Sequence, residues 1–226
     1  MSEAEVQVVL LSLRVAAWSV LATLVPAIAV AHVLARWSSP LCRVLRGLVM
    51  LPLVLPPIVT GYLLLAFLGR SSVLGELWHS WTGGYLAYTT TACVIAASVV
   101  SFPLFVESVR ISLVGVDPRL ELVSRSLGRG RVSTFLRVTL PLALPGVVAG
   151  AVLCFARALG EFGATILFAG NIEGETRQIP LAVFTLLNQP GAEAGVWRLV
   201  AVSAALALAA MVASSYLTRV RGGGRS

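Results

Sequence analysis

The segment from Val6 to Ala35 constrains the fold of this chain most, because it is almost entirely apolar and Arg14 is its only charged residue. A helix needs about 20 mostly apolar residues to cross a hydrocarbon layer about 30 Å thick. Four further segments meet this requirement: Val44–Gly69, Tyr85–Val106, Pro141–Ala169 and Trp197–Leu217. The stretch Ile179–Leu187 is too short to cross and is expected to be re-entrant or interfacial. The sequence therefore predicts an all-α polytopic membrane protein, a single domain over residues 1–226. We expect five transmembrane helices, or six if the first segment is divided or the short stretch crosses.

Composition agrees with a lipid bilayer as the surroundings. Of the 226 residues, 58% are hydrophobic and 12% are charged, whereas a soluble domain carries about 25% charged residues. The formal net charge is +7 and every basic residue is arginine. Basic residues that flank long apolar segments are typical of membrane topology rather than of nucleic-acid binding. The three cysteines lack the spacing of a metal site or a disulfide framework. We therefore expect no nucleic-acid partner and no metal ion on this chain.

The arginines are concentrated in the loops on one side of the predicted membrane. Twelve of the 17 basic residues lie there: Arg36, Arg43, Arg46, Arg110, Arg119, Arg125, Arg129, Arg131, Arg137, Arg219, Arg221 and Arg225. Cytoplasmic loops carry an excess of basic residues. This bias predicts an N-terminus outside, a cytoplasmic C-terminus, and a long cytoplasmic loop at about residues 108–140.

Within that loop, the sequence predicts two short helices joined by a glycine. Asp117 followed by Pro118 is typical of a helix start, with the aspartate as N-cap and the proline in the first turn. Gly128 stands where a left-handed residue would end this helix. A second short helix is predicted at about residues 131–138, before Pro141 opens the next transmembrane segment.

The first of these two helices is amphipathic. Leu120, Val123 and Leu127 recur at helical spacing, while Glu121 and Arg125 lie four residues apart and share a helix face. Two interpretations are open at this point. The loop is either a solvated segment at the membrane interface or a docking element for a cytoplasmic partner.

Two features inside the predicted spans are costly in lipid. Arg157 and Glu161 share a helix face within an apolar segment, where charges are unfavourable unless they are paired or face water. They form either a gate or a structural ion pair.

Pro56 and Pro57, with Gly61 one turn later, remove backbone donors from another span. This pattern indicates either a broken helix that lines a transport route or a kink that neighbouring helices fit.

The cytoplasmic loop and two other segments resemble a known family. Glu121, Gly128 and a Leu-Pro pair that ends at Pro141 resemble the loop of importer-type ABC permeases, although leucine and valine replace the two alanines that follow the glutamate there. Residues 51–65 and 155–177 are similar to the molybdate permeases of bacterial ABC importers. The resemblance covers nearly the whole chain, and it implies the importer-type, MetI-like permease fold.

The resemblance also implies roles for particular residues. The loop would couple the spans to a separate ATPase, with Glu121 and Arg125 orienting the coupling helix. The coupling set is Asp117, Leu120, Glu121, Val123, Ser124, Arg125, Leu127, Gly128 and Pro141. The candidates for the translocation pathway or gate are Pro56, Pro57, Gly61, Arg157 and Glu161. Glu175 and Arg177 would lie in an external loop.

Partners and cargo follow from the same resemblance. Two copies of the chain would form the pathway as multi-pass subunits of the bacterial cytoplasmic membrane. ATPase subunits would bind ATP and Mg²⁺ below them, and an extracytoplasmic binding protein would deliver a tetrahedral oxyanion. We expect no catalytic residue and no cofactor on this chain, whose sequence contains no P-loop motif. Molybdate is the expected cargo, with tungstate or sulfate as alternatives, and a passive channel or a membrane enzyme is the rival class.

Overall fold

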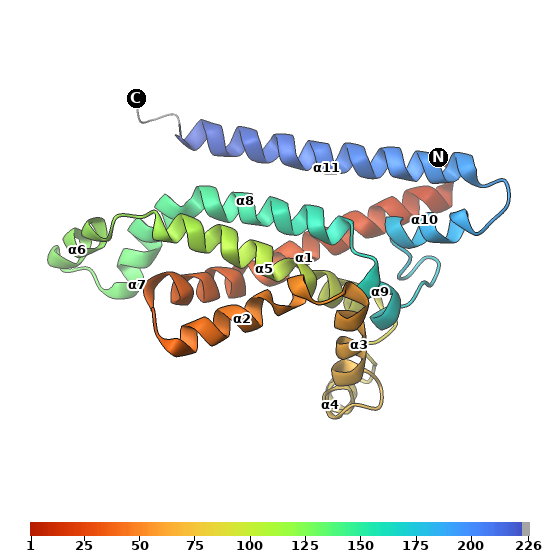
Figure 1. Ribbon diagram of the computed structural model, residues 1–226, viewed down its shortest axis with the longest axis horizontal. Coiled ribbons are helices and arrows are strands. Elements are labelled where there is room, and N and C mark those ends of the chain that lie inside the picture. The colour runs from red at the N-terminus through yellow and green to blue at the C-terminus, as the bar shows by residue number, and fades with distance from the viewer. Residues whose placement is uncertain (223–226) are drawn as a thin grey trace.

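The computed structural model describes the backbone of residues 1–222 and the side chains through residue 212, and this part of the chain is helical without a strand. The long helices run along the longest axis of the molecule, with α6 and α7 at one end and α10 toward the other, while α3 and α4 project to one side (Figure 1). The elements are α1 (Glu3–Arg36), α2 (Pro40–Val54), α3 (Pro57–Leu68), α4 (Val73–Thr82), α5 (Thr90–Val114), α6 (Pro118–Ser126), α7 (Arg131–Thr134), the π-helical turn η1 (Phe135–Thr139), α8 (Leu140–Leu159), α9 (Gly163–Phe168), α10 (Ile179–Leu187) and α11 (Glu193–Gly222).

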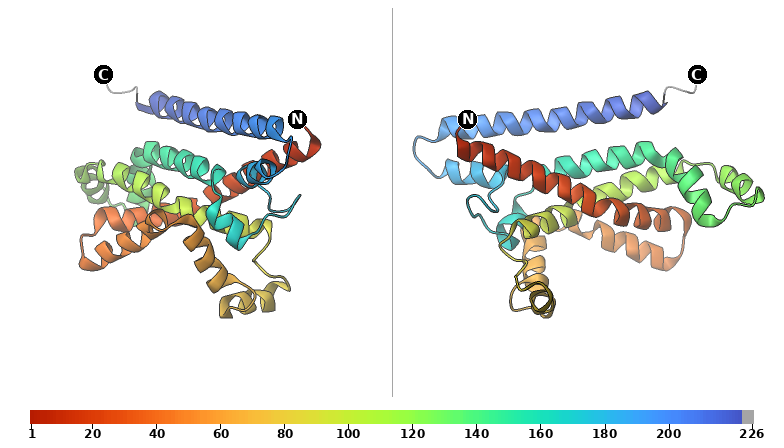
Figure 2. Two further views of the ribbon diagram at one scale, coloured as in Figure 1. Left: turned by 45° about the vertical axis from the view of Figure 1, so that its right-hand side comes forward. Right: turned by 180° about the vertical axis from the view of Figure 1, so that it is seen from behind.

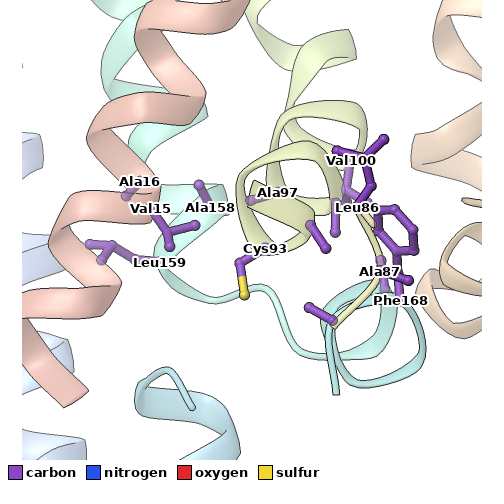
Figure 3. Packing of buried hydrophobic residues seen from close by; sticks show 14 residues of the cluster. Val15, Ala16, Leu86, Ala87, Cys93, Ala97, Val100, Ala158, Leu159 and Phe168 are labelled. Carbon is purple, nitrogen blue, oxygen red and sulfur yellow. The ribbon is translucent and has the colours of Figure 1, made fainter. Parts of the chain in front are cut away.

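Helices α1, α5 and α8 pack against one another and form the centre of the fold. In Figure 3, Val15 of α1, Ala97 of α5 and Ala158 of α8 belong to one buried cluster. Farther along the bundle, a Cβ added to Gly150 of α8 would lie 2.6 Å from the ring of Phe105 in α5. Small residues at these contacts let the helix backbones approach closely, which is typical of helices that pack within a membrane.

Four helices are long and apolar enough to cross a membrane: α1, α5, the continuous helix Arg131–Leu159, and α11 over Glu193–Val212. The pair α2 and α3 passes the same test together, although it is bent by 112°. Counted as one span, this pair raises the number to five. The predicted all-α membrane fold is therefore confirmed, and α10 is the short helix expected at Ile179–Leu187.

In the segment Val44–Gly69, the structure has the broken helix, which was one of the two interpretations left open above, and not a kink. It is divided between α2, which ends at Val54, and α3, which begins at Pro57. A residue that precedes a proline is pushed out of the helical region of backbone space. Leu55 and Pro56 each precede a proline, and their ψ angles are 143° and 133°. Two consecutive extended residues turn the chain sharply and produce the bend.

The segment Pro141–Ala169 also differs from the prediction. The helix begins earlier, because α7 continues through η1 into α8, so the predicted helix at 131–138 is not a separate unit. At η1, Leu140 donates its N–H to the carbonyl of Phe135, five residues back. At the other end, α8 stops at Leu159, and residues 163–168 form the separate helix α9.

The third predicted span, Tyr85–Val106, is shifted toward the C-terminus. Helix α5 begins at Thr90 and continues to Val114. The hydroxyl of Thr89 accepts a hydrogen bond from the N–H of Ala92 at 3.2 Å, which is an N-cap. This cap fixes the start of the helix, so residues 85–89 connect to it as a loop.

The two ends of the bundle carry different elements. Helices α6 and α7 lie at the end where α1 and α11 finish, whereas α9, α10 and the N-terminus lie toward the other end (Figures 1 and 2). The long loop and the C-terminal end of α11 therefore share one end of the molecule.

Three arginines used in the topology prediction lie outside the described part of the chain. These are the side chains of Arg219 and Arg221, and the whole of Arg225.

Candidate functional site

Both ends of α6 form as the sequence predicts. The Asp117 side chain accepts a hydrogen bond from the backbone N–H of Arg119 at 2.9 Å, and Pro118 occupies the first turn. Gly128 follows the helix with a φ of 85°. A Cβ added to Gly128 would meet no atom within 4 Å. The need for glycine therefore comes from the left-handed backbone and not from crowding.

Helix α6 and its C-cap residue carry apolar side chains that the described part of the chain leaves exposed. Leu120, Val123 and Leu127 are 42%, 57% and 77% exposed. Leu122, which the sequence analysis did not select, is 62% exposed. Contiguous exposed apolar side chains mark interaction surfaces. We call these four residues the α6 face.

The side of α6 that carries Glu121 and Ser124 lies against the rest of the molecule. Ser124 is buried, and its hydroxyl lies 3.1 Å from the hydroxyl of Thr134 in α7. Ser124 therefore connects α6 to α7. It is buried, whereas Leu120, Val123 and Leu127 of the predicted coupling set are exposed. Pro141 lies in the first turn of α8 and is exposed.

Glu121 connects α6 to two distant helices. Its carboxylate forms an ion pair with Arg36 at the end of α1 and accepts a hydrogen bond from the Thr139 hydroxyl at 2.8 Å. Arg125, expected to orient α6 together with Glu121, has no hydrogen-bond or ion-pair partner among the described side chains. Sequence spacing gave no signal for Arg36, because the pair joins residues 85 positions apart.

The two broken helices of the fold meet. Helix α3, which follows the break at Pro56, packs against α9, which follows the break after α8 (Figure 1). A Cβ on Gly61 would lie 2.7 Å from the Cα of Ala164, and a Cβ on Gly163 would lie 2.8 Å from the Cβ of Pro57. Glycine is thus required on both sides of this contact. The structure brings Pro57 and Gly61 to the element that follows Glu161, which the sequence alone did not indicate.

Arg157 and Glu161 form an ion pair at the break between α8 and α9. The Arg157 Nη1 and the Glu161 Oε2 are 2.7 Å apart. The other carboxylate oxygen of Glu161 accepts the N–H of Ala164 in the first turn of α9, at 2.8 Å. The Glu161 side chain is 1% exposed and that of Arg157 is 27% exposed. The pair therefore stabilises the bend, and Arg157 retains access to the surroundings of the helix.

Two threonines at the contact between α3 and α9 carry buried hydroxyls. Thr60 of α3 and Thr165 of α9 are 4% and 0% exposed, and neither side-chain oxygen has a hydrogen-bond partner among the described residues. Thr165 was not selected from the sequence. The available signal was its spacing, since it lies four residues after Glu161 on the same chain segment.

The loop between α9 and α10, which was predicted to be external, is folded on itself. Arg177 donates to the Asn171 side chain at 2.9 Å and pairs with Glu173 at 3.0 Å. Thr90 at the start of α5 donates to the backbone carbonyl of Glu175 at 2.9 Å, while the Glu175 residue is exposed. Of the two predicted loop residues, Arg177 is thus committed to contacts within its own loop.

Comparison with known proteins identifies the family. Residues 20–221 match the model of the binding-protein-dependent transport system inner membrane component. The chain belongs to this permease family. It is 48% identical to the molybdenum transport system permease protein ModB of Escherichia coli strain K12 over 220 residues, which cover 97% of this chain and 96% of that protein. The corresponding protein of Haemophilus influenzae is 44% identical over 215 residues, with 95% and 94% coverage.

Solved structures share the fold of this permease at low sequence identity. A chain of the MetNI methionine ABC transporter, in an inward-facing conformation, superposes with a TM-score of 0.75 at 18% identity and covers 97% of this chain and 99% of that chain. A chain of a bacterial ABC transporter involved in alginate import gives 0.70 at 17% identity, with 96% and 81% coverage. The fold implied by the sequence resemblance is confirmed.

The family match includes both structural features described above. The α6 face and the two broken helices lie within residues 20–221. In this permease, the anchored glutamate of the loop and the contact between α3 and α9 therefore lie inside the segment that matches the family.

Proposed function

We propose that this permease is the membrane subunit of an ATP-driven importer and that its cargo is molybdate. Two relatives that match along nearly their whole length, at 48% and 44% identity, are molybdenum transport permeases. Tungstate and sulfate are the alternative cargoes, since they are also tetrahedral dianions. The chain itself is a transport subunit, and ATP with Mg²⁺ binds to a separate ATPase.

The proposed assembly contains two copies of the permease in a bacterial cytoplasmic membrane. The N-terminus lies outside, and α6 faces the cytoplasm, where most of the arginines are found. The ATPase subunits bind at the α6 end. The extracytoplasmic binding protein delivers the oxyanion at the other end, near the exposed Glu175.

The single observation that carries this proposal is the exposed α6 face beside the anchored Glu121. Burial of an apolar side chain contributes about 1.5–3 kcal/mol, so Leu120, Val123 and Leu127 together suit a groove on a partner. Because Glu121 binds both Arg36 of α1 and Thr139 before α8, displacement of α6 acts on both helices.

Helix α8 offers a continuous route from α6 to the broken helices. It starts next to Thr139 and ends at the Arg157–Glu161 pair, where Glu161 also binds the first turn of α9. Helix α9 in turn contacts α3 with no room for a Cβ at Gly61. Broken helices are typical of transport routes. We therefore infer that ATPase closure moves α3 and α9 through α8, which opens or closes the pathway.

Uptake of labelled molybdate into vesicles tests this proposal. The vesicles contain this permease with its ATPase and binding protein, with and without ATP, and with excess sulfate or tungstate outside. We expect ATP-dependent uptake that tungstate reduces and sulfate does not. Block by sulfate would change the assigned cargo but keep the importer. Flux without ATP or without the partners would indicate a passive channel and contradict the role given to α6.

A further inference from the structure

We propose a second ligand site in this permease, a cavity at the α6 end that binds a tetrahedral oxyanion group such as phosphate or sulfate. The cavity has a volume of about 250 Å³ and lies between the end of α1 and the helices α6 and α7. It is distant from the contact between α3 and α9, toward the other end of α8 (Figure 1). The inference rests on the proposed function only for placing this end at the cytoplasmic side.

The lining of the cavity is strongly basic. Arg36, Arg125 and Arg131 line it, and Glu121 is the one acidic residue among the lining residues. The charge of the Glu121 carboxylate is already balanced by Arg36, and its oxygen also accepts a hydrogen bond from the Thr139 hydroxyl. Arg125 and Arg131 have no ion-pair or hydrogen-bond partner among the side chains that the structure describes. The cavity therefore carries two uncompensated positive charges.

Buried nitrogen atoms in the same wall also lack partners. The Nε of Arg36 and the Nδ1 of His32 are buried without a hydrogen-bond partner in the described part of the chain. The His32 ring is held in the wall by an edge contact with Phe135, at a centroid distance of 4.6 Å. Buried polar groups without partners are unfavourable. Both residues line the cavity, so a ligand there would lie against a wall whose own polar groups are incompletely hydrogen-bonded.

The chemistry of these groups selects a tetrahedral oxyanion. Guanidinium groups bind phosphate-type oxygens through paired hydrogen bonds, and three of them approach this cavity from three helices. A tetrahedral group presents oxygens in several directions and can accept from all three. A planar carboxylate can engage only one guanidinium in the paired geometry. The volume is many times the ~10–15 Å³ that one water requires, so a group of five heavy atoms fits.

Two sources can provide such a group. The cavity opens at the end of a transmembrane helix, beside Trp37, which is 66% exposed. Tryptophan is enriched at the membrane interface, and basic pockets there bind anionic lipid headgroups. A free oxyanion in the cytoplasm has the same chemistry. In either case, the ligand bridges α1, α6 and α7 and would restrain the movement of α6 against α1.

The experiment measures binding to the full-length permease alone, in two arms. In the first arm, inorganic phosphate and sulfate are titrated calorimetrically into protein in nanodiscs of phosphatidylcholine. In the second arm, native mass spectrometry counts retained lipid after reconstitution with phosphatidylglycerol or with phosphatidylcholine only. The test variant is Arg131→Gln, and the matched control is Arg129→Gln, which removes an exposed arginine of the same loop that does not line the cavity.

We expect Arg131→Gln to weaken binding about tenfold in one of the two arms, and Arg129→Gln to change it less than twofold. Loss in the titration arm identifies a free oxyanion, and loss in the lipid arm identifies a headgroup. If Arg131→Gln does not insert, Arg125→Gln replaces it. Equal behaviour of wild type and both cavity variants in both arms would overturn the site.

Two further results separate this inference from the proposed function. Oxyanion or lipid binding without ATP-dependent uptake would support the cavity and overturn the import function. ATP-dependent uptake with no binding in either arm would support the import function and overturn the cavity as a ligand site. Release of the bound group on addition of the nucleotide-free ATPase would contradict the proposed restraint of α6 by a ligand that stays bound in the assembly.

Discussion

Gly128 controls the turn after α6 because its backbone is left-handed, with a φ of 85°. A left-handed backbone costs an ordinary side chain about 1–2 kcal/mol, and a β-branched side chain more. We expect Gly128→Val to abolish ATP-dependent uptake while the permease still inserts in the membrane. The measurement is vesicle uptake normalised to the amount of inserted protein.

Gly47→Val is the control for Gly128→Val. Gly47 lies within α2, and a Cβ there would meet no atom within 4 Å. We expect it to transport at the wild-type rate. Full transport by Gly128→Val would contradict the role given to the turn.

At the scale of elements, the junction of α8 and α9 depends on the Arg157–Glu161 pair. Removal of one partner of a buried pair costs roughly 3–5 kcal/mol. Glu161 is 1% exposed and Arg157 is 27% exposed. Arg157→Gln, which leaves the buried carboxylate unpaired, should therefore lower the apparent melting temperature in detergent more than Glu161→Gln does. In Glu161→Gln, the amide oxygen can still accept from the N–H of Ala164.

The double variant Arg157→Gln with Glu161→Gln separates the two interpretations of this pair. It leaves no unpaired charge, so we expect the melting temperature to recover toward the wild-type value. Recovery of molybdate uptake in the same variant would show a structural pair. Stable protein that still fails to transport would show that the charge of Arg157 serves the pathway.

At the scale of the whole molecule, docking of α6 and transmission of its movement use different residues. The α6 face is exposed, whereas Glu121 is turned toward Arg36 and Thr139. Docking and transmission should therefore be separable. We expect Leu127→Asp to lose ATPase binding in a pull-down, because it places a charge in an apolar contact.

Arg36→Gln should keep ATPase binding but lower uptake roughly tenfold or more, since a charge-assisted hydrogen bond contributes about 1.5–3 kcal/mol. The charge-swapped pair Arg36→Glu with Glu121→Arg should restore part of the loss. Uptake and pull-down are measured on the same membranes. Loss of ATPase binding in Arg36→Gln would contradict the separation of the two roles.

Local features of this permease were predictable because they depend on neighbouring residues. The length of apolar segments predicted the membrane helices, and Asp117 and Gly128 predicted the ends of α6. The consecutive prolines at Pro56 and Pro57 indicated a disturbed helix. The sequence left open whether that disturbance was a kink or a break, and the bend of 112° shows a break.

Contacts between distant segments were decided only by the tertiary structure. No local pattern indicated that Glu121 pairs with Arg36 or that Gly61 contacts Ala164. Helix periodicity and caps specify the backbone within a few residues, but an ion pair over 85 positions depends on how whole helices pack. Most helices of this chain are apolar on several sides, so their packing depends on where small residues let two helix backbones approach closely. The helices were thus fixed locally, and the connection between α6 and the broken helices arose from their assembly.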